Sequence, residues 1–380
     1  MMLDVDESRL DDVAALEQTD QRGMLRALAG AGAQVREALT YSADAGIAGL
    51  ADDGRPRAVV VASLGGSSVV ADALDALTGQ SSPVPVEALH AGTLPGWVGP
   101  VDLVVAVSLS GAAPQPLAVA AEAARRGCRL LTVGTTGSPL ADVAAQARGI
   151  HVPLGRERRS SRASLWALLT PVLLAADTLD LIDAPSTALE AVADRLDEVS
   201  ARCRPSSEAF VNPAKSLALD LAGSVPLVLG NGELAGVAAR RAAAQLARNA
   251  RHPAVHGTLP DDASNLVATF DGPFARTAED IFADPDEDGA MAARLRLLLL
   301  RDAADHEEPE IARIGDVVRD TAAASGIPVS ETVAEGGHPL ERLAGLVGLT
   351  DFASVYVALV LGLDPSTSPH VADLKERITA

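Results

Sequence analysis

The feature that most constrains the fold is an apolar run that ends in small hydroxyl residues and leads into a helical pattern. Residues 103–107 are all apolar, residues 108–111 read SLSG, and helical spacing follows over residues 114–126. A buried strand that passes through serines into a helix is suited to hold an anion. The helix N-terminus offers unpaired N–H groups, and the hydroxyls add further donors.

The same arrangement occurs earlier in the chain. Residues 58–62 are apolar, residues 63–68 read SLGGSS, and residues 69–77 continue with helical spacing. Taken singly, each segment is also compatible with an ordinary strand-to-helix turn capped by serine. Two such loops in one half of a chain favour one phosphate-bearing ligand held between them. Neither contains the spaced phosphate loop that ends in Gly-Lys-Ser/Thr, so we do not expect nucleotide hydrolysis.

Strand and helix patterns alternate along the chain, which predicts an α/β fold with parallel sheets covered on both faces. Residues 1–50 are expected to be an N-terminal helical segment, residues 51–204 a first sheet domain and residues 205–380 a second. A linker is predicted at 203–207, an exposed acidic loop at 284–289, and C-terminal helices at 340–361 and 371–378. Strands are predicted at 58–62, 85–89, 103–107, 129–133, 150–152, 225–229, 255–258, 265–270, 294–299 and 327–332.

Composition excludes several classes of function. The formal net charge is -20 and aromatic residues make up 2% of the chain, so a nucleic-acid partner is not expected. The acidic N-terminal stretch lacks a basic-then-apolar signal segment, and no uninterrupted apolar run is as long as a membrane span. Two cysteines, Cys128 and Cys203, are typical of a reduced compartment, which favours a cytoplasmic location.

Three further features have a functional and a plain interpretation. Residues 135–138 (TTGS) follow a predicted strand and either extend the anion site or cap a helix. Arg162 is either a guanidinium that pairs with phosphate or part of a solvated basic segment. Lysine occurs only at Lys215 and Lys375, and Lys375 is either a proton donor or a surface residue of an amphipathic helix. The histidines form no metal-ligand motif, so a metal site is not expected.

These segments resemble the SIS (sugar isomerase) domain family and, more closely, its bifunctional phosphoglucose/phosphomannose isomerase branch, over nearly the whole chain. Arg162 stands at the place of the family's active-site arginine. The C-terminal stretch, including residues 351–358 (DFASVYVA) and Lys375, is the most specific match. By this resemblance the phosphosugar-binding loops contain Gly65, Gly66, Ser67, Ser108, Ser110 and Gly111.

The resemblance implies two SIS-type parallel-sheet αβα sandwich subdomains with extra N- and C-terminal helices. It also implies aldose–ketose isomerisation of hexose 6-phosphates in a homodimer, without a cofactor. The candidate catalytic residues are Arg162, Lys375, Arg248, Ser264 and Asp261.

Three positions depart from the family pattern. Ala113 replaces a hydroxyl residue of the phosphate loop, Arg248 stands where the family has its catalytic Glu, and Ser264 stands where it has its ring-opening His. An arginine does not release its proton at neutral pH and so is not a base.

The departures leave three functions open. An active isomerase needs a surrogate base, for which Asp261, Asp262 and His256 are the nearest candidates. A catalytically weakened protein would bind or sense a phosphosugar. An isomerase for a different phosphosugar would use Arg248 to contact an additional acidic group.

Overall fold

The computed structural model describes residues 5–79, 82–89, 92–155, 160–275 and 294–379, which form two compact units. The first, called here the five-stranded unit, is Gly30–Asp197. The second, the four-stranded unit, combines Met1–Ala29 with Glu198–Ala380. The predicted acidic loop at 284–289 lies outside the described residues. The domain boundaries expected at 50 and 204 remain proposals, since compactness alone divides the chain near residues 30 and 197.

The five-stranded unit contains one parallel sheet with the strand order β2-β1-β3-β4-β5. Every residue of β1 and β3 is buried, as expected for parallel strands that are covered on both faces. The strands are β1 (Val59–Ser63), β2 (Val86–Leu89), β3 (Leu103–Ser108), β4 (Arg129–Gly134) and β5 (Ile150–Pro153).

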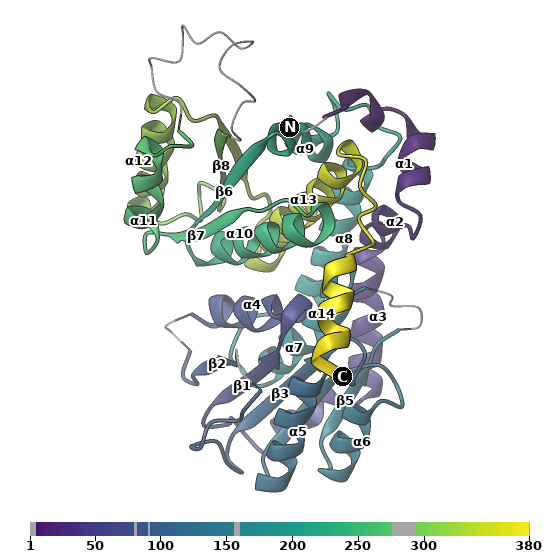
Figure 1. Cartoon of the computed structure of the whole chain (residues 1–380). Helices are drawn as coiled ribbons and strands as arrows, with labels where there is room; N and C mark the ends of the chain where they lie inside the picture. The colour runs from purple at the N-terminus through teal and green to yellow at the C-terminus, as the bar shows by residue number, and fades with distance from the viewer. Residues whose placement is uncertain (1–4, 80–81, 90–91, 156–159, 276–293, 380) are drawn as a thin grey trace, which may run out of the picture. The chain divides into compact units, whose positions relative to one another are not determined.

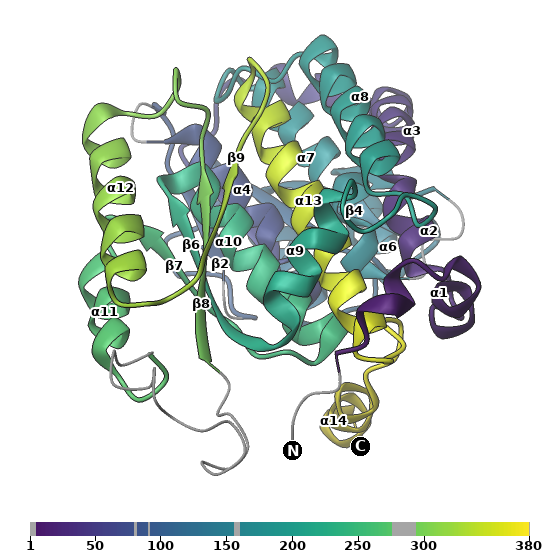
Figure 2. The ribbon, with the colours of Figure 1, turned by 90° about the horizontal axis from the view of Figure 1, so that it is seen from above.

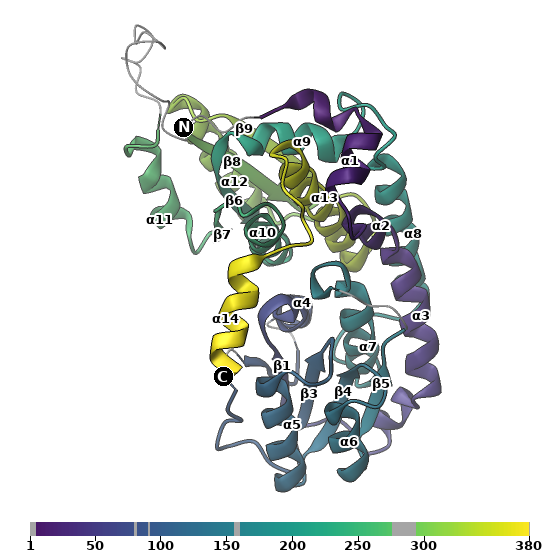
Figure 3. The ribbon, with the colours of Figure 1, turned by 45° about the vertical axis from the view of Figure 1, so that its right-hand side comes forward.

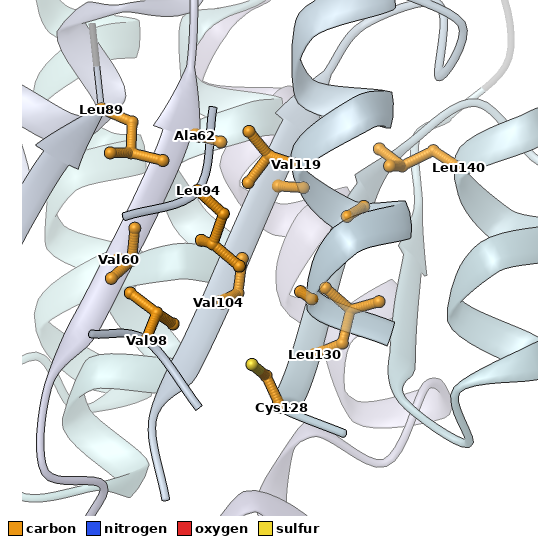
Figure 4. Packing of buried hydrophobic residues seen from close by; sticks show 13 residues of the cluster. Val60, Ala62, Leu89, Leu94, Val98, Val104, Val119, Cys128, Leu130 and Leu140 are labelled. Atoms are coloured by element: carbon orange, nitrogen blue, oxygen red, sulfur yellow. The ribbon is translucent and has the colours of Figure 1, made fainter. Parts of the chain in front are cut away.

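Helices cover both faces of this sheet (Figure 3). On one face α5 (Pro114–Arg126) and α6 (Pro139–Gln146) enclose a cluster that includes Val60, Val104 and Val119 (Figure 4). The other face is covered by α4 (Val69–Thr78) and α7 (Leu165–Thr178), with α3 (Ala31–Asp44) packed on α7. The remaining elements are η2 (Ile47–Ala51), η3 (Gly65–Ser67), η4 (Ser161–Ala163) and most of α8 (Ser186–Arg202).

The four-stranded unit repeats this plan with the order β7-β6-β8-β9, again all parallel (Figure 1). Two sheets, each sandwiched between helices, confirm the predicted α/β architecture. The strands are β6 (Ser224–Asn231), β7 (Val255–Leu259), β8 (Arg294–Arg301) and β9 (Val329–Val333).

In this unit α11 (Ala263–Val267), η6 (Ala268–Asp271) and α12 (Pro309–Ala324) lie on one face of the sheet (Figure 2). The other face carries α9 (Pro213–Ala222), α10 (Glu233–Gln245) and α13 (Pro339–Val360). The π-helical turn η5 (Leu246–Ala250) continues α10. The other helices are η1 (Glu7–Leu10), α1 (Val13–Thr19), α2 (Met24–Ala29) and α14 (Pro369–Thr379).

The helix α13 forms the centre of the four-stranded unit. Its 22 residues are long and apolar enough to cross a membrane by length and composition, but 89% of its most apolar window is buried inside the protein. It also contains the charged residues Glu341, Arg342 and Asp351. These features identify α13 as a core helix.

One predicted strand is wrong. Residues 265–270 form the end of α11 followed by η6, not a strand. Leu266 and Phe270 lie four residues apart and are both buried in the same cluster, which is the helical pattern. Val267, Thr269 and Phe270 have high strand propensity. Packing of this segment against the sheet outweighs that propensity here.

The segment predicted as a linker packs against the core of the four-stranded unit. Lys215, whose side chain is fully buried, donates to the carbonyl oxygens of Pro205 (2.8 Å) and Ser207 (2.6 Å). The Tyr356 hydroxyl donates to the Cys203 carbonyl at 2.7 Å. Burial lowers the pKa of the Lys215 ammonium. These bonds hold residues 203–207 against α9 and α13.

A buried ion pair joins α10 to α13. The Arg241 guanidinium donates through Nε and Nη2 to the two carboxylate oxygens of Asp351, at 2.8 and 2.6 Å. The Gln245 amide donates to the same carboxylate at 3.2 Å. The side chains of Arg241 and Asp351 are only 3% and 7% exposed, so each charge depends on the other for compensation.

Candidate functional site

The two serine loops lie at the same point of the five-stranded sheet. From β1 the chain passes to β2 on one side, and from β3 it passes to β4 on the other side, so β1 and β3 flank the topological switch point. Ligands of open parallel sheets bind at the carboxyl ends of the strands at this position. Ser63 ends β1 and Ser108 ends β3, so the structure brings both loops to the switch point.

The first loop turns sharply between β1 and α4. Gly65 has a φ of +65°, which L side chains rarely adopt, and it begins the short helix η3. The buried Ser67 hydroxyl donates to the Leu64 carbonyl at 3.1 Å, so its proton is already used inside the loop. The Ser68 side chain makes no cap on α4, so backbone N–H groups remain the donors here.

The second loop presents hydroxyl protons. Ser108 Oγ accepts from the Ala113 N–H at 3.4 Å, and Ser110 Oγ accepts from the Ala112 N–H at 3.3 Å. Because both hydroxyls accept in these contacts, each keeps an O–H that can donate to an anion. Prolines at 114 and 116 remove two first-turn N–H donors from α5, so the serines supply donors that this helix lacks.

The third loop supports the second one. Thr135 Oγ1 donates to the Leu109 carbonyl at 2.7 Å, and Leu140 N–H donates to the Gly111 carbonyl at 2.9 Å. Ser138 is the N-cap of α6 and accepts from the Ala141 N–H at 3.4 Å. Of the two interpretations of residues 135–138, the structure therefore favours a helix cap that also positions the Ser108–Gly111 loop.

The helix η4 places Arg162 beside the first loop. A Cβ on Gly66 would overlap Ser161 Oγ and would lie 3.3 Å from Ser161 Cβ, so the two segments are in direct contact. Arg162 follows Ser161 in the chain and is 7% exposed. Within the five-stranded unit, the predicted binding residues therefore lie around one edge of the sheet. They are Gly65, Gly66, Ser67, Ser108, Ser110, Gly111 and the segment that contains Arg162.

Replacing Gly111 with alanine is expected to destabilise the five-stranded unit by about 2 kcal/mol. Gly111 has a φ of +62°, and an added Cβ would overlap Ser138 Oγ. Gly96→Ala is the matched control, since no atom lies within 4 Å of its Cβ position. Urea unfolding of both variants measures the difference, and equal stabilities would show that the turn tolerates a side chain.

Two histidines, the half-buried His151 and the buried His252, have structural surroundings. His151 Nδ1 lies 2.8 Å from Thr132 Oγ1, and burial lowers the pKa of the His151 imidazole. His252 is 6% exposed, and burial lowers its pKa as well. Both rings are therefore expected to be neutral at pH 7. Among the described residues, no cluster of three His, Cys, Asp or Glu side chains could hold a metal ion.

The other predicted catalytic residues belong to the four-stranded unit. Arg248 lies in the π-helical turn η5, and its carbonyl accepts from Ser368 Oγ at 3.2 Å. Asp261 and Ser264 are both exposed. Ser264 lies in α11, and Asp261 lies just before this helix. Lys375 lies in α14, and its side chain is outside the described part of the structure.

The three candidates for a surrogate base differ in their surroundings. Asp262 accepts the Thr258 N–H at 2.8 Å, so its carboxylate stabilises the turn after β7. His256 is exposed on β7. Asp261 is exposed within that turn.

Sequence reasoning missed the charged clusters at the core of the four-stranded unit, around Arg241 and Arg301. Their partners lie far away in the sequence or in irregular loops, so no local spacing indicates them. The only signal is a charged residue within an apolar run, such as Asp351 in α13 or Arg301 at the end of β8.

Comparisons with known proteins find similar isomerases. Residues 210–378 match the model of the bacterial phospho-glucose isomerase C-terminal SIS domain. A bifunctional phosphoglucose/phosphomannose isomerase from Caldicellulosiruptor bescii is 24% identical over 84% of this chain and 89% of that protein. One from Aquifex aeolicus is 25% identical over 85% and 90%. Over most of its length the chain is therefore similar to bifunctional phosphoglucose/phosphomannose isomerases.

The fold of this chain is also found in solved structures. A hypothetical protein from Thermus thermophilus superposes with a TM-score of 0.68 at 16% identity, covering 96% of this chain and 93% of that protein. The match extends over both units and so includes both parallel sheets. The arrangement of two parallel sheets with their covering helices is therefore shared with a solved structure over almost the whole chain.

Proposed function

We propose that this protein binds a hexose 6-phosphate through the Ser63–Ser68 and Ser108–Gly111 loops and isomerises it between aldose and ketose. The observation that carries the proposal is the meeting of both loops at the switch point between β1 and β3. Hydroxyl and N–H donors there suit a phosphate ester. The similarity to bifunctional phosphoglucose/phosphomannose isomerases supplies the proposed reaction type.

Within this proposal each candidate residue has a chemical role. Arg162 pairs with the phosphate or with a developing oxyanion through its planar fork of donors. Lys375 donates a proton to, or hydrogen-bonds, a sugar oxygen. Isomerisation also moves a proton between C1 and C2, and the exposed Asp261 carboxylate is the proposed base, since Asp262 is engaged by the Thr258 N–H. Arg248 and Ser264 would bind the sugar rather than move protons.

A second candidate function follows from Arg248 and Ser264. General acid–base groups typically contribute roughly 100- to 10,000-fold each, and these two residues replace both of the family's groups. If no surrogate acts, the protein binds a phosphosugar and serves as a sensor or regulator. Under either function we propose a small-molecule phosphosugar as the partner, together with a homodimer, a cytoplasmic location and no nucleic-acid or membrane partner.

One experiment distinguishes the two functions. Glucose 6-phosphate and mannose 6-phosphate are titrated by calorimetry, and formation of fructose 6-phosphate is followed in the same sample. For an isomerase we expect binding and turnover, with Asp261→Asn lowering kcat at least 100-fold while Kd changes little. Binding without turnover would favour the sensor. Absence of binding would rule out the proposed isomerase and a sensor of these two phosphosugars.

A further inference from the structure

The four-stranded sheet has its own switch point. From β6 the chain passes to β7 on one side, and from β8 to β9 on the other, so β6 and β8 correspond to β1 and β3. At the last paired position of β6 and β8, Asn231 lies beside Arg301. Both side chains are buried, at 1% and 9% exposed. Two hydrogen-bond donors thus lie at the carboxyl ends of β6 and β8, the position at which open parallel sheets bind ligands.

A carboxylate of the protein itself meets these donors. Arg301 Nη2 donates to Glu307 Oε2 at 2.6 Å, and Arg301 Nε donates to Oε1 at 3.2 Å. Asn231 Nδ2 donates to the same Oε1 at 2.6 Å. The Glu307 side chain is 3% exposed. Its carboxylate therefore receives three donors while shielded from water, as a bound oxyanion would.

The loop after β3 and the loop after β8 resemble each other. Each leads into a helix that begins with proline, Pro114 in α5 and Pro309 in α12. In the five-stranded unit this loop carries serine hydroxyls, whereas in the four-stranded unit it carries Glu307. The N-terminus of α12 follows two residues later and adds a positive end of a helix dipole.

Neighbouring carboxylates hold the Arg301 guanidinium in place. Arg301 Nη1 also donates to Asp316 at 2.7 Å and to Glu331 at 3.1 Å. Arg319 pairs with Asp316 and with Asp320, each at 3.0 Å. The local charges are thus already compensated without Glu307. What its removal leaves unsatisfied is the set of Asn231 and Arg301 donors that face its carboxylate.

We infer that the second switch point is an oxyanion site already filled by the Glu307 carboxylate, and that removing this side chain would admit an inorganic oxyanion such as sulfate. Of the two switch points formed by the described residues, only the first is then open to an external anion in the intact chain. The inference stands on the Arg301, Asn231 and Glu307 contacts and does not depend on the proposed isomerase activity.

The test uses sulfate as the probe in the full chain carrying Ser108→Ala and Ser110→Ala, which weakens anion binding at the first switch point. Glu307→Ala is compared with Glu308→Ala, an exposed neighbour with the same charge change. In chloride we expect Glu307→Ala to melt roughly 4–8 °C below Glu308→Ala. Sulfate at equal ionic strength should recover at least half of that gap, beyond its general stabilising effect on the control.

Three outcomes would overturn the inference. One is a folded Glu307→Ala variant that gains no more from sulfate than Glu308→Ala. Another is a Glu307→Ala variant that fails to fold in both salts while the shape-preserving Glu307→Gln folds. The third is sulfate binding at this point in the chain that retains Glu307. Folding of Glu307→Ala in sulfate but not in chloride would support the inference.

Discussion

Replacing Asp351 with alanine is expected to lower the free energy of unfolding of the four-stranded unit by about 3–5 kcal/mol. The substitution leaves the Arg241 guanidinium buried between α10 and α13 without the carboxylate that receives two of its donors. Urea unfolding followed by circular dichroism measures the loss. Both tryptophans, Trp97 and Trp166, lie in the five-stranded unit, so tryptophan fluorescence reports whether that unit is spared.

Two further variants show whether burial causes this loss. Asp373 pairs with Arg377 at 3.0 Å in α14 with its side chain 52% exposed, so Asp373→Ala should cost no more than about 1 kcal/mol. Arg241→Met combined with Asp351→Leu removes both charges and should recover most of the lost stability. If Asp351→Ala costs as little as Asp373→Ala, the ion pair does not hold α13 in place.

The sequence predicts the sheets well because their signals are local. A run of four or five apolar residues with a polar residue at each end is enough to place β1, β3 and β8 to within one or two residues. The serines at the strand ends were found for the same reason, since each directly follows its run. Parallel topology then brings Ser63 and Ser108 to one edge without any further information.

The charged clusters could not be predicted in this way because their partners are distant. Arg241 and Asp351 are 110 residues apart, and Asn231 and Glu307 are 76 apart. Only the packing of α10 on α13, and of the β8–α12 loop against β6, brings them together. A lone charge in an apolar run therefore indicates a buried partner without identifying it.

Strand 265–270 failed for a related reason. A short run of Leu, Val, Thr and Phe has similar spacing in a helix and in a strand. Which faces are buried depends on the sheet against which the run packs, and here Leu266 and Phe270 share one helical face. Local propensity was overruled by tertiary packing.

Replacing Arg162 with methionine is expected to raise the Kd for glucose 6-phosphate roughly 10- to 100-fold. The segment Ser161–Ala163 contacts the Gly65–Ser67 turn, and the proposed role of Arg162 is to offer the planar donors of its guanidinium to the phosphate. Arg162→Lys keeps the charge but loses the fork of donors, so its Kd should lie between those of the native protein and Arg162→Met. Calorimetric titration measures all three values.

A control must distinguish the loss of a contact with the phosphate from the loss of a positive charge and from unfolding of the protein. Arg125→Met removes the same charge from the five-stranded unit at a side chain that is 72% exposed, and its Kd should stay within about two-fold of the native value. Thermal unfolding identifies any variant that is too unstable to interpret, since Arg162 is buried. A folded Arg162→Met protein that binds glucose 6-phosphate as tightly as Arg125→Met would remove Arg162 from the site. The serine loops would then hold the phosphate without a guanidinium, and the proposed electrostatic role would fail while the switch-point site remained.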